Sequence, residues 1–89
     1  MDMKLAGTYS NRTATAQLVA LAARGHLLGF YVNSTTAGTI VLRDGDGSGT
    51  AISGTITPAI GWHFFPVEFS NGLHATIGGT LNVTFVYRA

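Results

Sequence analysis

Apolar and polar residues alternate through most of the chain from residue 27 onward. The clearest example lies near the C-terminus, where Leu81, Val83 and Phe85 alternate with mostly polar neighbours. A period of two places successive side chains on opposite faces of a strand. Short strands with turn signals about every 8–12 residues are typical of antiparallel sandwiches and barrels. We therefore predict an all-β fold, a single small antiparallel β-sandwich, jelly-roll-like, of about 7–8 short strands.

Turn-forming residues divide the first part of this region. Residues 33–38, Asn-Ser-Thr-Thr-Ala-Gly, separate two apolar runs, so residues 27–43 are predicted to form a β-hairpin. Residues 44–49, Asp-Gly-Asp-Gly-Ser-Gly, form a predicted loop. The next strand is expected at residues 51–57 and ends at Pro58, which cannot donate to a strand ladder.

The second part contains a proline and two glycine turns. Pro66 interrupts the run 62–69 and predicts an edge strand or a bulge. The Asn-Gly pair at 71–72 is the strongest short turn signal, and the Gly-Gly pair at 78–79 predicts a second tight turn. The final predicted strand follows at residues 81–88.

Residues 13–24 fit two kinds of structure. Their alanines and leucines favour a helix that Gly25 could cap. However, Thr13 and Thr15 alternate with alanine, and no polar stripe of helical period is present, so we favour a strand. Residues 1–12 are expected to be an N-terminal arm or edge strand, and residues 13–89 the β-sandwich domain.

Alternation also sorts the large apolar residues onto two faces. The predicted core consists of Leu28, Phe30, Val32, Ile40, Leu42, Phe65, Val67, Phe69, Leu73, Ile77, Leu81, Val83 and Phe85. The predicted outward apolar residues are Tyr31, Val41, Trp62, Phe64 and Val86. Contiguous apolar patches usually mark interfaces, so these five residues are the candidate subunit interface; the alternative is that the sandwich strands are locally buried on both faces.

The composition supports an interface. Only nine of 89 residues are charged, five basic and four acidic, where a soluble domain usually has about a quarter. A domain this small has a marginal core, and the absence of cysteine excludes disulfides. We therefore expect cyclic homo-oligomers. The scattered basic residues argue against nucleic-acid binding, and we expect neither a signal peptide nor a membrane span.

Two motifs could bind metal, and for each we favour a plainer interpretation. Residues 44–49 match the opening of a calcium loop, but the twelfth position is Thr55 where a bidentate carboxylate belongs. An exposed loop has the same composition. The three histidines, His26, His63 and His74, lack metal-ligand spacing, although the turn at 71–72 could bring the last two together. We predict no metal or cofactor.

Catalytic and glycan-attachment motifs receive similar interpretations. The chain has no cysteine, no nucleophile elbow and only four carboxylates, so we predict no catalytic residues and no enzymatic activity. Asn11, Asn33 and Asn82 each begin an Asn-x-Thr triplet, which we attribute to chance in a threonine-rich chain. The aromatic residues Tyr31, Trp62 and Phe64 could instead form a sugar-binding platform.

Two stretches, residues 28–44 and 55–87, carry a resemblance. They contain a strand ending in Tyr-Val, an Ile-x-Leu strand, an aromatic-Pro strand, Asn-Gly-Leu, and Ile-Gly-Gly-Thr before the last strand. This pattern resembles small virion proteins of tailed bacteriophages and gene transfer agents, of the head-decoration, head-fibre or spike-base type. It does not extend to residues 1–27.

The resemblance implies a structural role without catalytic residues. The expected protein is a virion component, synthesised in the bacterial cytoplasm, that oligomerises and docks onto major capsid or tail protein. The alternative is a carbohydrate-binding module used in host attachment.

Overall fold

The structure is a computed structural model that describes residues 8–89, and within these residues the chain forms strands and no helix. The strands are β1 (Thr8–Arg12), β2 (Ala16–Val19), β3 (Gly25–Asp44), β4 (Thr50–Ala51), β5 (Gly61–Phe69) and β6 (Leu73–Arg88). All of their pairings are antiparallel. The predicted all-β fold is confirmed. The expected arm or edge strand of residues 1–12 lies partly outside the described residues, and its last five residues form β1.

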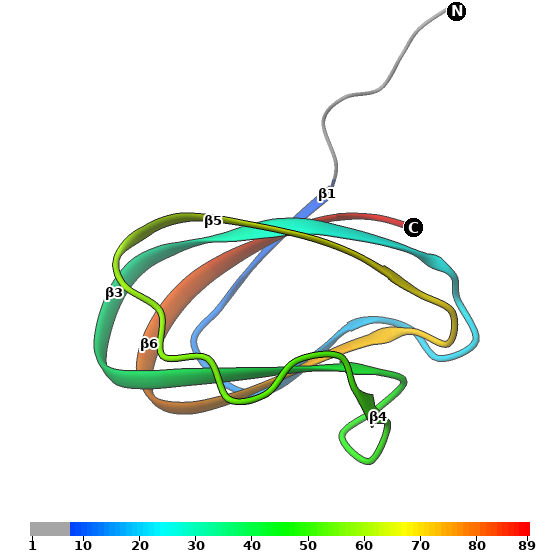
Figure 1. Cartoon of the computed structure of the whole chain (residues 1–89), viewed down its shortest axis with the longest axis horizontal. Coiled ribbons are helices and arrows are strands. Elements are labelled where there is room, and N and C mark those ends of the chain that lie inside the picture. Colours follow the sequence, from blue (N-terminus) through cyan, green and yellow to red (C-terminus); the bar gives the residue numbers. More distant parts are fainter. Residues whose placement is uncertain (1–7) are drawn as a thin grey trace, which may run out of the picture.

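Two long strands form the centre of the fold. β3 has 20 residues and β6 has 16, and they pair from His26 opposite Arg88 to Asp44 opposite Leu73. Both strands curve at the same place, so the two-stranded ribbon folds back over itself (Figure 1). As a result, the structure has two layers, and the two halves of β3 lie in different layers, as do the two halves of β6.

Each layer contains four strand segments. The first layer has the order β1, second half of β6, first half of β3, β5. The second layer has the order β2, first half of β6, second half of β3, β4. Because β3 and β6 contribute to both layers, the six strands supply eight segments, arranged in the order of a jelly roll.

The bend corrects two sequence predictions. Residues 27–43 are not a hairpin, because they lie within the single strand β3. Gly78 and Gly79 do not form a turn between strands, because both lie within β6. The turn-forming residues of the two strands instead lie opposite each other and form the corner of the ribbon.

The corner has a local backbone cause. Between Thr36 and Thr39, β3 has one more residue than the paired stretch of β6, which is a β-bulge. An extra residue bends a strand and increases its twist. Ala37 and Gly79 both have positive φ angles there, 54° and 67°. A Cβ atom on Gly79 would collide with the carbonyl group of Ala37, so glycine permits the close approach of the two strands.

The core lies between the two layers. Its buried apolar residues are Leu18, Val19, Leu27, Phe30, Val32, Ile40, Leu42, Phe69, Leu73, Ala75, Leu81, Val83 and Phe85. Three predicted core residues, Phe65, Val67 and Ile77, pack against this cluster while partly exposed. The prediction for Leu28 is wrong. Leu27 faces Tyr87 and Gly29 faces Val86, so Leu28 is a bulged residue and Leu27 takes the core position.

The remaining sequence predictions have mixed outcomes. Residues 16–19 form a strand, as favoured, and β5 is an edge strand that pairs only with β3. Its bulge falls at Phe65 and Pro66, opposite Leu28. The expected strand at 51–57 is shorter than predicted, because only Thr50–Ala51 and an isolated bridge from Ile56 to Ile40 pair with β3.

Candidate functional site

The outer side of the first layer carries the exposed aromatic residues of the described chain. Tyr9, Tyr31, Trp62 and Phe64 are 71%, 46%, 48% and 73% exposed. At about 200 Å² for a whole aromatic side chain, they leave roughly 500 Å² of aromatic surface in water. That is at the upper end of the largest patch on an ordinary monomer. We call these four residues and the half-buried Val86 the aromatic face.

Strand register places the aromatic face in two rows. Tyr9, Val86, Gly29 and Phe64 follow one another across β1, β6, β3 and β5. The next row across the same strands is Asn11, Thr84, Tyr31 and Trp62. Residues opposite each other in antiparallel strands point to the same side of the sheet, so both rows lie on one surface.

Gly29 leaves space for the Trp62 indole at the centre of this surface. A Cβ atom built there would lie 2.8 Å from a ring carbon of the Trp62 indole and would also collide with the carbonyl oxygen of His63. The indole therefore lies against the Gly29 backbone. Aromatic rings packed over strand glycines compensate for the missing side chain, and here the contact fixes the orientation of Trp62.

A cluster of amides adjoins the aromatic rows. The Asn11 side-chain amide donates to Asn82 Oδ1 at 2.8 Å and to Thr84 Oγ1 at 2.9 Å. The Asn33 amide donates to the same two oxygens at 3.2 and 3.3 Å. These residues come from β1, β3 and β6. We call Asn11, Asn33, Asn82 and Thr84 the asparagine cluster.

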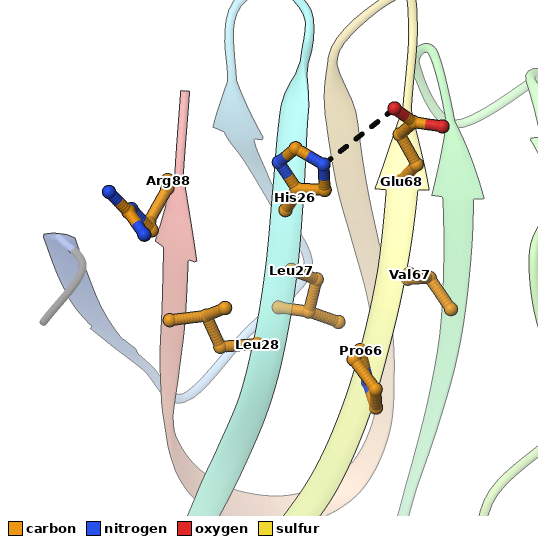
Figure 2. Close-up of a pocket in the computed structure, with 7 residues that line it drawn as sticks. All are labelled: His26, Leu27, Leu28, Pro66, Val67, Glu68 and Arg88. Atoms are coloured by element: carbon orange, nitrogen blue, oxygen red, sulfur yellow. Dashed lines mark ion pairs between the residues drawn. The ribbon is translucent and has the colours of Figure 1, made fainter. Parts of the chain in front are cut away.

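The opposite end of the same surface is charged. Arg88, His26 and Glu68 lie side by side on β6, β3 and β5, with His26 in the middle (Figure 2). His26 Nε2 lies 3.6 Å from Glu68 Oε2, and both side chains are mostly exposed. Beside this charged row lies a hollow of about 440 Å³, which is also lined by the apolar residues Leu27, Leu28, Pro66 and Val67.

Four of the five predicted interface residues lie together on this surface. Tyr31, Trp62, Phe64 and Val86 belong to the aromatic face. Val41 does not, because it lies beyond the bend in the second layer, opposite Thr76, and is half-buried. The structure thus separates Val41 from the other four.

The calcium-like loop uses its carboxylates within the protein. Asp44 accepts hydrogen bonds from the backbone N–H groups of Ser70 and Asn71. Asp46 Oδ1 accepts one from the Ser48 N–H at 2.9 Å, which is an Asx turn. Residues 8–89 contain no group of three metal-ligating side chains.

The structure does not bring the histidines together as one site. His26 pairs with Glu68, and His63 stacks on Phe30 with 5.2 Å between ring centroids. His74 is buried on β6, opposite Gln17 and Arg43. The turn at 71–72 joins β5 in the first layer to the first half of β6 in the second layer, and these two strands do not pair.

Sequence reasoning missed several residues of this surface. Tyr9 lies in a segment whose alternation was too short to assign. The sequence shows Asn11, Asn33 and Asn82 only as the first residues of three Asn-x-Thr triplets, and this recurrence is the one signal that relates them. His26, Glu68 and Arg88 gave no signal, because their adjacency depends on strand order.

Comparison with known protein families, with curated proteins and with solved structures found no match for the chain. Among residues 8–89 there is no helix of the length and apolarity needed to span a membrane.

Proposed function

We propose that the protein is a structural component of a tailed-bacteriophage particle that assembles with copies of itself through the aromatic face. One observation carries the proposal: four large aromatic residues are exposed on a single face of a domain with nine charged residues. An apolar surface of this size is more stable when it is covered by protein.

Two further features support this function. The jelly-roll order of the segments is frequent in viral capsid and lectin domains. The pattern of residues 28–44 and 55–87 resembles small virion proteins of tailed phages and gene transfer agents. In this role the second layer and the strand edges remain free to dock onto capsid or tail protein.

Self-association is tested by the molar mass of the purified protein over a range of concentrations. The proposal expects an oligomer, and expects Phe64→Ser to be monomeric with an unchanged circular dichroism spectrum. Thr57→Ser is the control, because residue 57 is exposed and lies outside the aromatic face. A wild-type protein that remains monomeric at high micromolar concentration contradicts the proposal.

The virion setting needs a separate measurement. Mass spectrometry of purified phage particles that encode this chain is expected to find it in many copies per particle. Its absence from intact particles contradicts the virion role, even if the protein self-associates.

The asparagine cluster favours a second function, carbohydrate binding. Tyr31 and Trp62 offer ring faces next to fixed amide and hydroxyl groups, which is the combination of apolar and polar contacts that orients a small polar ligand. Because Trp62 is the single tryptophan, its fluorescence reports directly on this site. Titration with neutral and N-acetylated oligosaccharides should then change the emission of wild type and of Val41→Ala but not of Asn33→Ala. No change with any sugar contradicts this function.

A further inference from the structure

We infer that the second copy packs face to face on the first layer about a two-fold axis that runs along β3. This inference rests on the proposed self-association and adds the symmetry and the register of the interface. It follows from the order of charges on three adjacent strands, shown in Figure 2.

The charged row is antisymmetric about β3. His26 faces Arg88 on β6 and Glu68 on β5, so the positive and negative side chains lie on opposite sides of His26. With strands about 4.8 Å apart, each charge is one strand spacing from the β3 line. All three side chains are exposed on the outer side of the layer.

Two two-fold axes parallel to the sheet pass over His26, one along β3 and one across the strands. Only the axis along β3 makes these charges complementary. An axis along β3 exchanges the strand on one side of β3 for the strand on the other, and so places Arg88 of each copy opposite Glu68 of the other. An axis across the strands would place Arg88 against Arg88 and Glu68 against Glu68. Like charges in contact disfavour a register, whereas complementary charges select one.

The same axis gives suitable contacts for the apolar residues. It places Phe64 of one copy on Val86 of the other, and Tyr31 against its own equivalent. Two sheets related in this way keep their strand directions aligned, as in the common packing of sandwich layers about 10 Å apart. The hollow beside Leu28 of one copy then faces the hollow of the other.

The axis also places Trp62 close to polar groups of the other copy. It carries the Trp62 backbone position on β5 to the position opposite Thr84 on β6, beside the asparagine cluster, while the indole itself extends over Gly29. An indole N–H needs an acceptor when it is buried, and the oxygens of this cluster are acceptors. The two-fold arrangement therefore covers the exposed aromatic residues of β3 and β5 and brings Trp62 of each copy close to the asparagine cluster of the other.

Charge reversal tests the register by sedimentation equilibrium at low salt. Arg88→Glu and Glu68→Arg are each expected to weaken the homodimer at least tenfold in Kd, because each creates two like-charge contacts. The double variant R88E/E68R should return to within about threefold of wild type. An equimolar mixture of the two single variants should form heterodimers, because both reciprocal contacts then join opposite charges. Asp46→Lys, a charge reversal outside the surface, should leave Kd unchanged.

The outcomes separate the two proposals. A monomeric wild type overturns both. If wild type dimerises and Phe64→Ser does not, but the single reversals leave Kd unchanged or the mixture forms no heterodimer, self-association stands and the two-fold register is overturned. The register is also overturned if wild type forms an oligomer larger than a dimer and neither Arg88→Glu nor Glu68→Arg changes its Kd.

Discussion

The carboxylate of Asp44, at the end of β3, accepts a hydrogen bond of 2.9 Å from the backbone N–H of Asn71, between β5 and β6. The Ser70 N–H donates to both oxygens of the same carboxylate at 3.2 and 3.1 Å. This turn carries the chain from the first layer to the second. Asp44 thus stabilises the connection between β5 and β6. Asn71 Oδ1 also accepts a hydrogen bond from the Ala22 N–H, in the connection between β2 and β3.

Replacement of Asp44 with Ala should therefore destabilise the fold. Hydrogen bonds to a charged acceptor contribute about 1.5–3 kcal/mol, and the partial exposure of this one lowers the expected loss to about 1–2 kcal/mol. Urea denaturation measures the loss as a lower midpoint.

Asp46→Ala is the matched control, because Asp46 is exposed and accepts a single bond from Ser48. It should change the free energy of unfolding by less than about 0.5 kcal/mol. Added Ca²⁺ should leave the melting temperatures of wild type and of both variants unchanged. A calcium-dependent rise in wild type that Asp44→Ala abolishes would restore the metal-loop interpretation.

Leu27 and Leu28 are adjacent but should differ sharply in their contributions to stability. Leu27 is fully buried in the core, whereas the bulge turns Leu28 toward the outer hollow. Leu27→Ala should cost about 2–5 kcal/mol and Leu28→Ala less than about 1.5 kcal/mol. Chemical denaturation of both variants measures the difference, and equal losses would mean that the β3 bulge is misplaced.

Period-two alternation was sufficient to predict the fold class and most of the core, because burial on one face of a strand dictates the residue type directly. It was insufficient at Leu28, where a bulge reverses the parity and depends on the partner strand. It was also insufficient at residues 33–38 and 78–79. There the same turn-forming residues suit a hairpin and a strand corner, and only the pairing of β3 with β6 distinguishes them.

The candidate surface was predictable in part for the same reason. Tyr31, Trp62 and Phe64 could be placed outward from their own strands, since each alternates with core residues. That β6, β3 and β5 are neighbours is a property of topology, so the row of Arg88, His26 and Glu68 could not be foreseen. In the asparagine cluster, Asn11 contacts Asn82 and Thr84, which are 71 and 73 positions away in the sequence, beyond the range of any local pattern.

The strand corner predicts effects of different size for two small substitutions. Gly79→Ala adds a Cβ at a positive φ against the Ala37 carbonyl, and should cost about 1–3 kcal/mol. Ala37→Gly relieves a positive φ of 54°, at the cost of a more flexible unfolded chain, and should change stability by less than about 1 kcal/mol. Thermal denaturation of the pair measures both effects. A harmless Gly79→Ala would mean that the strands are farther apart at the corner.

The contact between Gly29 and Trp62 gives the most direct test of the aromatic face in a single protomer. In Gly29→Ala the new Cβ meets both the indole and the His63 carbonyl, and the carbonyl belongs to the backbone of β5 and cannot move freely. We expect a loss of about 1–3 kcal/mol together with a red shift of Trp62 emission, since the displaced indole enters water. Gly54→Ala is the control, because nothing lies within 4 Å of a Cβ at that position. It should leave emission unchanged and stability within about 0.5 kcal/mol or slightly raised. If Gly29→Ala keeps the wild-type emission and stability, Trp62 does not lie over Gly29, and the described arrangement of the aromatic face is wrong at that contact.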